Sequence, residues 1–159
     1  MMTLLADAVD LDLDASRGFR FAPGVREALT AFRGRCTVVR LATLDNDVLG
    51  VPRWYTLQEA WAEPGSDAAA SWSGNPVVAV GPSDDPELVL ATATPVVVVG
   101  ADNAASRWTR QVVDAVRATC RSVLVVDMGE RPDPSYADIA TYGHDRRHGA
   151  ALLGLLTGT

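Results

Sequence analysis

Two runs of β-branched residues constrain the fold of this chain more than any other feature. Residues 95–100 read P-V-V-V-V-G, and residues 122–129 read S-V-L-V-V-D-M-G. Neither run alternates apolar with polar residues, and strands without such alternation are typically buried on both faces, as in a parallel sheet covered by helices. The two runs therefore predict an α/β fold with a mostly parallel sheet.

A strand followed by glycine, an acidic turn and a helix recurs from residue 76 onward. Residues 76–81 precede P-S-D-D-P, residues 95–100 precede a helix expected over 106–120, and residues 122–129 precede E-R-P-D-P. We expect each glycine to allow a sharp exit from its strand, and the following Asp or Ser to cap the next helix. Repeated units of this kind predict right-handed crossovers and a Rossmann-like, three-layer α/β/α sandwich.

The first 75 residues are less regular, and we assign them to the same single domain, residues 1–159. Val25, Leu29 and Phe32 share one face of a helix expected over 23–33. The other elements expected before residue 76 are a strand at 37–42, a loop at 46–54, a short helix at 55–62 and a surface loop at 64–75.

Composition excludes several classes of function. The net charge is −6, so the surface repels phosphate backbones and anionic lipids, and we expect neither nucleic-acid nor membrane binding. All 14 basic residues are arginine, which excludes Schiff-base chemistry and a P-loop, since both need lysine. No apolar run could span a membrane, and the acidic start of the chain is unlike a secretory signal, so we expect a cytoplasmic location.

The sequence predicts no cofactor and no metal. No G-x-G-x-x-G follows a strand, which argues against a dinucleotide. His144 and His148 are spaced i and i+4, but two arginines lie between them and disfavour a cation. Cys36 and Cys120 are too few for a disulfide scaffold and are interpreted as small apolar fillers.

Polar residues follow the predicted strands at the edge where α/β proteins bind ligands. The candidate ligand-binding residues are Asp102, Asn103, Arg107 and Asp127. An acidic mouth of this kind can bind sugar hydroxyls or a hard cation. The alternative is that these side chains serve only as helix caps and turn residues. No catalytic residue is identified.

Two other patterns suggest different functions. Asp12 and Asp14 resemble the D-x-D motif of haloacid-dehalogenase-type phosphatases, in which a nucleophile and an acid/base point toward Mg²⁺-bound phosphate; the alternative is a solvated acidic segment. Residues 54–72 contain three tryptophans and a tyrosine. This aromatic-rich segment either packs in the core or faces a sugar, a partner or a second copy of the chain.

The C-terminal part resembles the second domain of family 3 glycoside hydrolases of the bacterial β-N-acetylglucosaminidase (β-N-acetylhexosaminidase) type. The matching stretches are V-V-V-V-G-A-D-N at 96–103, R-W-T-R-Q-V-V at 107–113, V-L-V-V-D-M-G at 123–129 and A-T-Y-G at 140–143. This chain has A-D-N-A-A-S at 101–106 where the family has a run similar to R-D-x-H-R-H.

The resemblance implies an accessory domain in carbohydrate metabolism that packs beside a (β/α)8 barrel. In the family the barrel carries an aspartate nucleophile and a His–Asp acid/base pair, and a barrel needs about 200 residues or more. None of its motifs can be placed on this sequence, so the expected function is non-catalytic. The chain would be either the C-terminal part of a larger enzyme or a free-standing relative. The alternatives are a Mg²⁺-dependent phosphatase and a small-ligand or protein-binding module.

Overall fold

The computed structural model describes residues 17–43, 45–46, 51–52, 75–85, 94–144 and 146–158. Its strands are β1 (Arg20–Phe21), β2 (Thr37–Leu41), β3 (Asp45–Asn46), β4 (Val51–Pro52), β5 (Val77–Val80), β6 (Val96–Gly100), β7 (Val123–Asp127) and β8 (Ile139–Ala140). Its α-helices are α2 (Val25–Ala28), α5 (Arg107–Thr119) and α6 (Arg146–Thr157), and its 3-10 helices are η1 (Leu29–Phe32) and η3 (Pro134–Tyr136).

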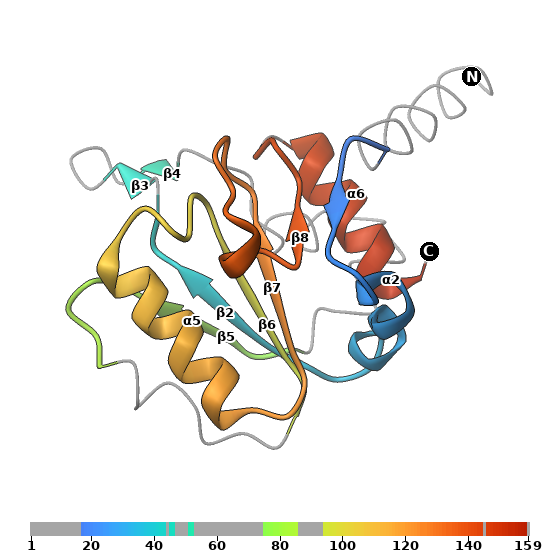
Figure 1. Cartoon of the computed structure of the whole chain (residues 1–159), viewed down its shortest axis with the longest axis horizontal. Helices are drawn as coiled ribbons and strands as arrows, with labels where there is room; N and C mark the ends of the chain where they lie inside the picture. Colours follow the sequence, from blue (N-terminus) through green and yellow to red (C-terminus); the bar gives the residue numbers. More distant parts are fainter. Residues whose placement is uncertain are drawn as a thin grey trace.

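Six strands form one mostly parallel sheet in the order β1-β8-β7-β6-β2-β5, which confirms the predicted α/β class (Figure 1). The five strands from β8 to β5 are parallel, and β1 joins β8 antiparallel at one edge. Val98 of β6 lies opposite Val39 of β2 on one side and Val125 of β7 on the other. The two valine runs are therefore central, adjacent strands.

The strand order contains one reversal of direction. The chain passes from β2 outward to the edge strand β5 and then returns across β2 to form β6, β7 and β8. The reversal lies between β2 and β6, and in open α/β sheets ligands bind beyond the carboxyl ends of strands near such a point. The loops after β6 and β7 are therefore the first place to look for a site.

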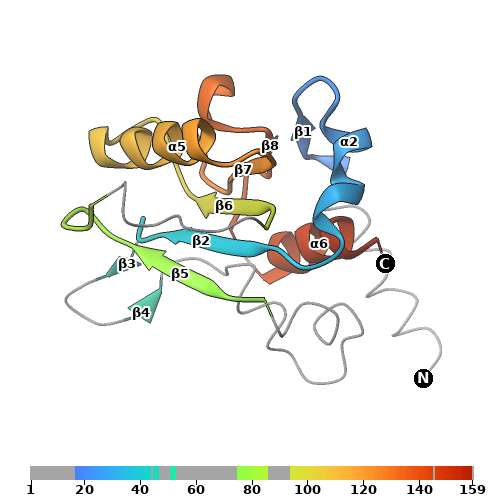
Figure 2. The ribbon, with the colours of Figure 1, turned by 90° about the horizontal axis from the view of Figure 1, so that it is seen from below.

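Helices cover both faces of the sheet, and each face has its own core (Figure 2). On the α5 side, Val112, Val113 and Val116 pack against valines of the central strands. On the other side, α6 and η1 contribute leucines and a phenylalanine that pack against Val97, Val126 and their neighbours. Because alternate strand residues serve opposite cores, the valine runs have no position for a polar side chain.

The N-terminal helix differs from the prediction. The expected helix over 23–33 is a single α-turn, α2, that continues as the 3-10 helix η1, and it begins after Gly24 in a left-handed conformation with φ 79°. Leu29 and Phe32 are buried as predicted, and Val25 packs against the same core. The segment therefore keeps the predicted apolar face while its backbone tightens.

The remaining expectations have mixed outcomes. The strands predicted at 37–42 and 76–81 and the helix predicted at 106–120 are confirmed as β2, β5 and α5. The region expected to be a loop at 46–54 contributes to the small antiparallel pair of β3 and β4. The helix at 55–62, residues 64–74 of the expected loop and the helix after residue 86 lie outside the described residues. Within the described ranges, no helix combines the length and apolarity that a membrane crossing requires.

Candidate functional site

Asp127 is the centre of the polar structure at the carboxyl edge. It is the last residue of β7 and is fully buried. Its Oδ1 accepts backbone N–H groups from Asp102 and Gly129, both at 2.8 Å, and its Oδ2 accepts the N–H of Asn103 at 3.0 Å. The carboxyl group thus joins the loop after β6, residues 101–106, to the loop after β7, residues 128–133.

Burial raises the pKa of Asp127 above its ordinary value of 3.8. The three backbone N–H groups lower this pKa and the nearby Asp102 carboxylate raises it, with burial the largest influence. In the described part of the chain, no basic side chain forms an ion pair with Asp127. Its role is therefore to satisfy loop N–H groups away from water, and it is not exposed to a substrate.

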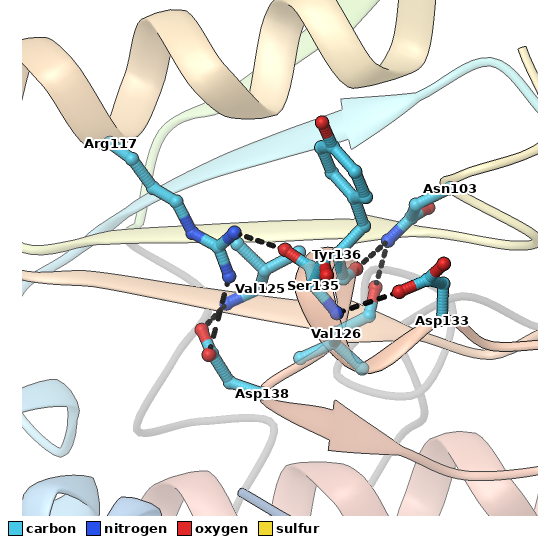
Figure 3. Close-up of polar contacts among 8 residues, drawn as sticks. All are labelled: Asn103, Arg117, Val125, Val126, Asp133, Ser135, Tyr136 and Asp138. Carbon is cyan, nitrogen blue, oxygen red and sulfur yellow. Dashed lines mark hydrogen bonds and ion pairs between the residues drawn. The ribbon is translucent and has the colours of Figure 1, made fainter.

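Asn103 is also fully buried, and its side chain forms hydrogen bonds with the backbone. Its Nδ2 donates to the carbonyl oxygens of Val126 at 3.1 Å and Tyr136 at 3.2 Å (Figure 3). Its Oδ1 is buried without a hydrogen-bond partner and lies over Gly100, where a Cβ would overlap it. Both amide protons therefore hold the loop, and Gly100 provides the space for the side chain.

Asp102 adopts a left-handed backbone conformation with φ 53°. Its Oδ1 accepts the N–H of Arg131 at 2.9 Å, and it packs directly on Gly129, where a Cβ would overlap both its carboxylate and its backbone. Neither Gly100 nor Gly129 uses the left-handed conformation that favours glycine, since neither has a positive φ. They are needed because polar side chains approach their Cα atoms closely.

The predicted capping of α5 by Ser106 is also wrong, because the Ser106 side chain makes no cap bond. In the first turn of α5, the Thr109 hydroxyl group donates to the carbonyls of Asn103 at 2.6 Å and Ser106 at 2.8 Å, so it fixes the preceding loop and does not replace the missing cap. Arg107 is exposed in the first turn of α5 and has no bond to Asp102, Asn103 or Asp127. The structure therefore brings together three of the four candidate residues and leaves Arg107 outside.

The segment after the second loop is fixed by further polar contacts (Figure 3). Asp133 caps η3 by accepting the N–H of Ser135 at 2.8 Å, as the capping prediction requires. Arg117 of α5 donates to the Ser135 carbonyl at 2.5 Å and to Asp138 Oδ1 at 3.3 Å. Asp138 Oδ2 also accepts the N–H of Val125 at 2.8 Å. These contacts hold η3 between α5 and β7.

An open cleft of about 680 Å³ lies between the two loops. Its lining residues are Asp102, Ala104, Ala105, Glu130, Arg131, Pro132, Asp133 and Pro134. Asp127 and Asn103 do not line it. The cleft is of ligand-binding size, and of the four candidate ligand-binding residues only Asp102 lines it.

Beyond β8, the A-T-Y-G stretch forms a second unusual turn. Thr141 is buried, and it donates its N–H to Asp127 O at 3.0 Å and its hydroxyl group to Gly143 O at 2.7 Å. Tyr142 has φ 57°, and the residue is 48% exposed. The sequence analysis did not indicate the exposed position of Tyr142, although the glycine that follows it is a common sign of a turn.

His148 packs against this turn. Its imidazole lies where a Cβ of Gly143 would be, and its ring stacks on Phe19 with centroids 6.3 Å apart. Across the described ranges, no group of three His, Cys, Asp or Glu residues is arranged to hold a metal ion. Burial raises the pKa of Cys36 to about 12 and also raises that of Cys120, so neither thiol is activated as a nucleophile.

Two sequence hypotheses concern residues whose structure is not described. Asp12 and Asp14, the possible phosphatase pair, lie outside the described residues, as does the aromatic-rich segment 54–72. Comparison with protein-family models, curated protein sequences and solved structures finds no match to this chain.

Proposed function

We propose that this chain is a non-catalytic accessory domain of glycoside hydrolase family 3 lineage, similar to the second domain of β-N-acetylhexosaminidases. It would act beside a (β/α)8 barrel domain, with carbohydrate as its ligand class. We also infer that the complete chain forms a Rossmann-like three-layer α/β/α sandwich. The family assignment rests on the sequence stretches quoted above, which fall on β6, α5, β7 and the turn after β8.

The observation that carries the non-catalytic part is the use of Asp127. Retaining glycosidases place two carboxyl groups about 5–5.5 Å apart on either side of the scissile bond. Asp127 is fully buried and accepts three backbone N–H groups, and Asp102 accepts the N–H of Arg131. A carboxyl group engaged in this way stabilises the loops, and Asp127 does not line the cleft.

The test is hydrolysis of p-nitrophenyl N-acetyl-β-D-glucosaminide by the purified chain. We expect release of p-nitrophenol at the rate seen in buffer alone. Turnover that is lost in Asp102→Asn, with the folded state verified by circular dichroism, would overturn the proposal. A parallel assay with p-nitrophenyl phosphate and Mg²⁺ tests the phosphatase alternative, for which metal-dependent release lost in Asp12→Asn would be the supporting result.

A further inference from the structure

Two side chains on the rim of the cleft form no contact that stabilises the described part of the fold. Glu130 and Arg131 are exposed, and among the described residues neither side chain has a hydrogen bond or ion pair. Only the backbone N–H of Arg131 is used, by Asp102. A neighbouring carboxylate and guanidinium offer acceptors and donors side by side, which suits the paired hydroxyl groups of a sugar.

Tyr142 is exposed to solvent and has an unfavourable backbone conformation. A positive φ is strained for a bulky side chain, and Tyr142 has φ 57° while the residue is 48% exposed. Its turn is fixed on both sides, by the Thr141 hydroxyl group bonded to Gly143 O and by Gly143 packed on His148. Strain that is maintained for an exposed aromatic ring indicates a contact residue.

The cleft and Tyr142 lie at the same edge of the sheet. Strands β6, β7 and β8 are adjacent and parallel, so the loops that follow them leave from the same end (Figure 1). Glu130 and Arg131 follow β7 and Tyr142 follows β8, and these two strands are neighbours, about 5 Å apart. A ligand with two or three sugar rings can therefore stack one ring on the phenol while another ring reaches the rim of the cleft.

We infer that this edge is a carbohydrate-binding surface, with Tyr142 stacking on one pyranose ring and Glu130 and Arg131 bonding hydroxyl groups of the next. The inference deepens the proposed function and relies on it for the class of ligand. Asp102, Glu130 and Asp133 line the cleft against one arginine, so the surface disfavours anionic ligands and fits a neutral or amino sugar.

The experiment is a titration of the full ¹⁵N-labelled chain with the trisaccharide of β-1,4-linked N-acetylglucosamine, followed by amide NMR shifts. We expect shifts confined to residues 102–106, 129–133 and 141–144. Tyr142→Gly removes the ring and suits the positive φ, so it should leave the fold intact and weaken binding about tenfold. Glu130→Gln and Arg131→Gln should each weaken binding about threefold.

Matched controls separate this edge from the general surface. Glu27→Gln and Arg121→Gln alter an exposed glutamate on α2 and an exposed arginine between α5 and β7, and both should leave the affinity unchanged. The absence of shifts at millimolar trisaccharide, shifts that map elsewhere, or wild-type affinity in Tyr142→Gly would each overturn the inference. Hydrolysis of the aryl glycoside together with binding at this edge would overturn the proposed function and leave the binding surface intact.

Discussion

The central strands and the loops that follow them are held by opposite kinds of interaction. In β6 and β7, buried valines pack against two cores and no side chain forms a polar contact until Asp127. In the loops, Asp127, Asn103 and Asp102 bond backbone groups of the neighbouring loop. The strands are stabilised by dispersion and apolar burial, which do not depend on the direction of a contact. The loops depend on a few hydrogen bonds, whose strength depends on their geometry. A polar residue at a strand end can therefore contribute as much to the stability of the fold as a core valine.

The largest expected effect is from Asp127→Ala. It leaves three N–H groups without their acceptor in a buried site, each at a cost of about 1–3 kcal/mol. Loss of the costly buried carboxyl group offsets part of this, and we expect the free energy of unfolding to fall by about 4 kcal/mol. Urea denaturation measures the change. A loss below about 1 kcal/mol would show that water satisfies these N–H groups and that the loops do not depend on Asp127.

Val98→Ala tests the other side of the comparison. Val98 is fully buried in the α5-side core, and removal of its two methyl groups should cost about 2.5 kcal/mol through lost burial and a residual cavity. Val78→Ala, at a partly buried position on the edge strand β5, is the control and should cost about 1 kcal/mol. Equal losses at the two positions would argue against a tightly packed centre.

Gly129→Ala probes the close approach between the loops. Its Cβ would overlap Asp102, so the two loops must separate, and we expect a loss of about 2 kcal/mol. Gly154→Ala is the matched control, since a Cβ in this position of α6 meets nothing, and it should stabilise the chain by about 0.8 kcal/mol. Thermal unfolding of both variants measures the contrast, and an unchanged melting temperature in Gly129→Ala would contradict it.

The smallest expected effect is a pH dependence from Asp127. Because burial raises its pKa, the folded chain binds this proton more tightly than the unfolded chain. Its stabilising contribution is complete below the unfolded pKa and is lost as the pH rises through the folded one, from about pH 4 upward. The stability advantage of the wild type over Asp127→Asn should therefore shrink between pH 4 and pH 7 in urea titrations. An advantage that grows with pH would mean that the backbone N–H groups outweigh burial.

Residues with a strong periodic or β-branched pattern could be predicted, and residues whose role depends on a distant loop could not. The valine runs and the spacing of Val112 and Val116 predict β6, β7 and α5, because burial on both faces of a sheet leaves a pattern in the sequence. Arg117 and Asp138 contact one another across 21 positions, and nothing near either residue indicates it.

The candidate site shows the same division. The sequence indicated Asp102, Asn103 and Asp127 because they follow strands, and the structure brings them together. It did not indicate that the polar groups of these three residues form hydrogen bonds with the loop backbone. Nor did it indicate that the side chains of Glu130 and Arg131 line the cleft without a hydrogen bond among the described residues. Residue type and position predict that a group is near an edge, whereas hydrogen-bond satisfaction depends on which backbone groups the fold brings to it.

The sequence by itself determined that this chain builds a mostly parallel sheet with helices, since consecutive buried valines have few other stable arrangements in water. Only the tertiary structure decided the strand order, the role of Gly100 and Gly129 as points of close contact, and the exposure of Tyr142 at a strained turn. Those features arise where segments far apart in the chain come into contact. The local conformational preferences of the residues do not indicate which distant segments these will be.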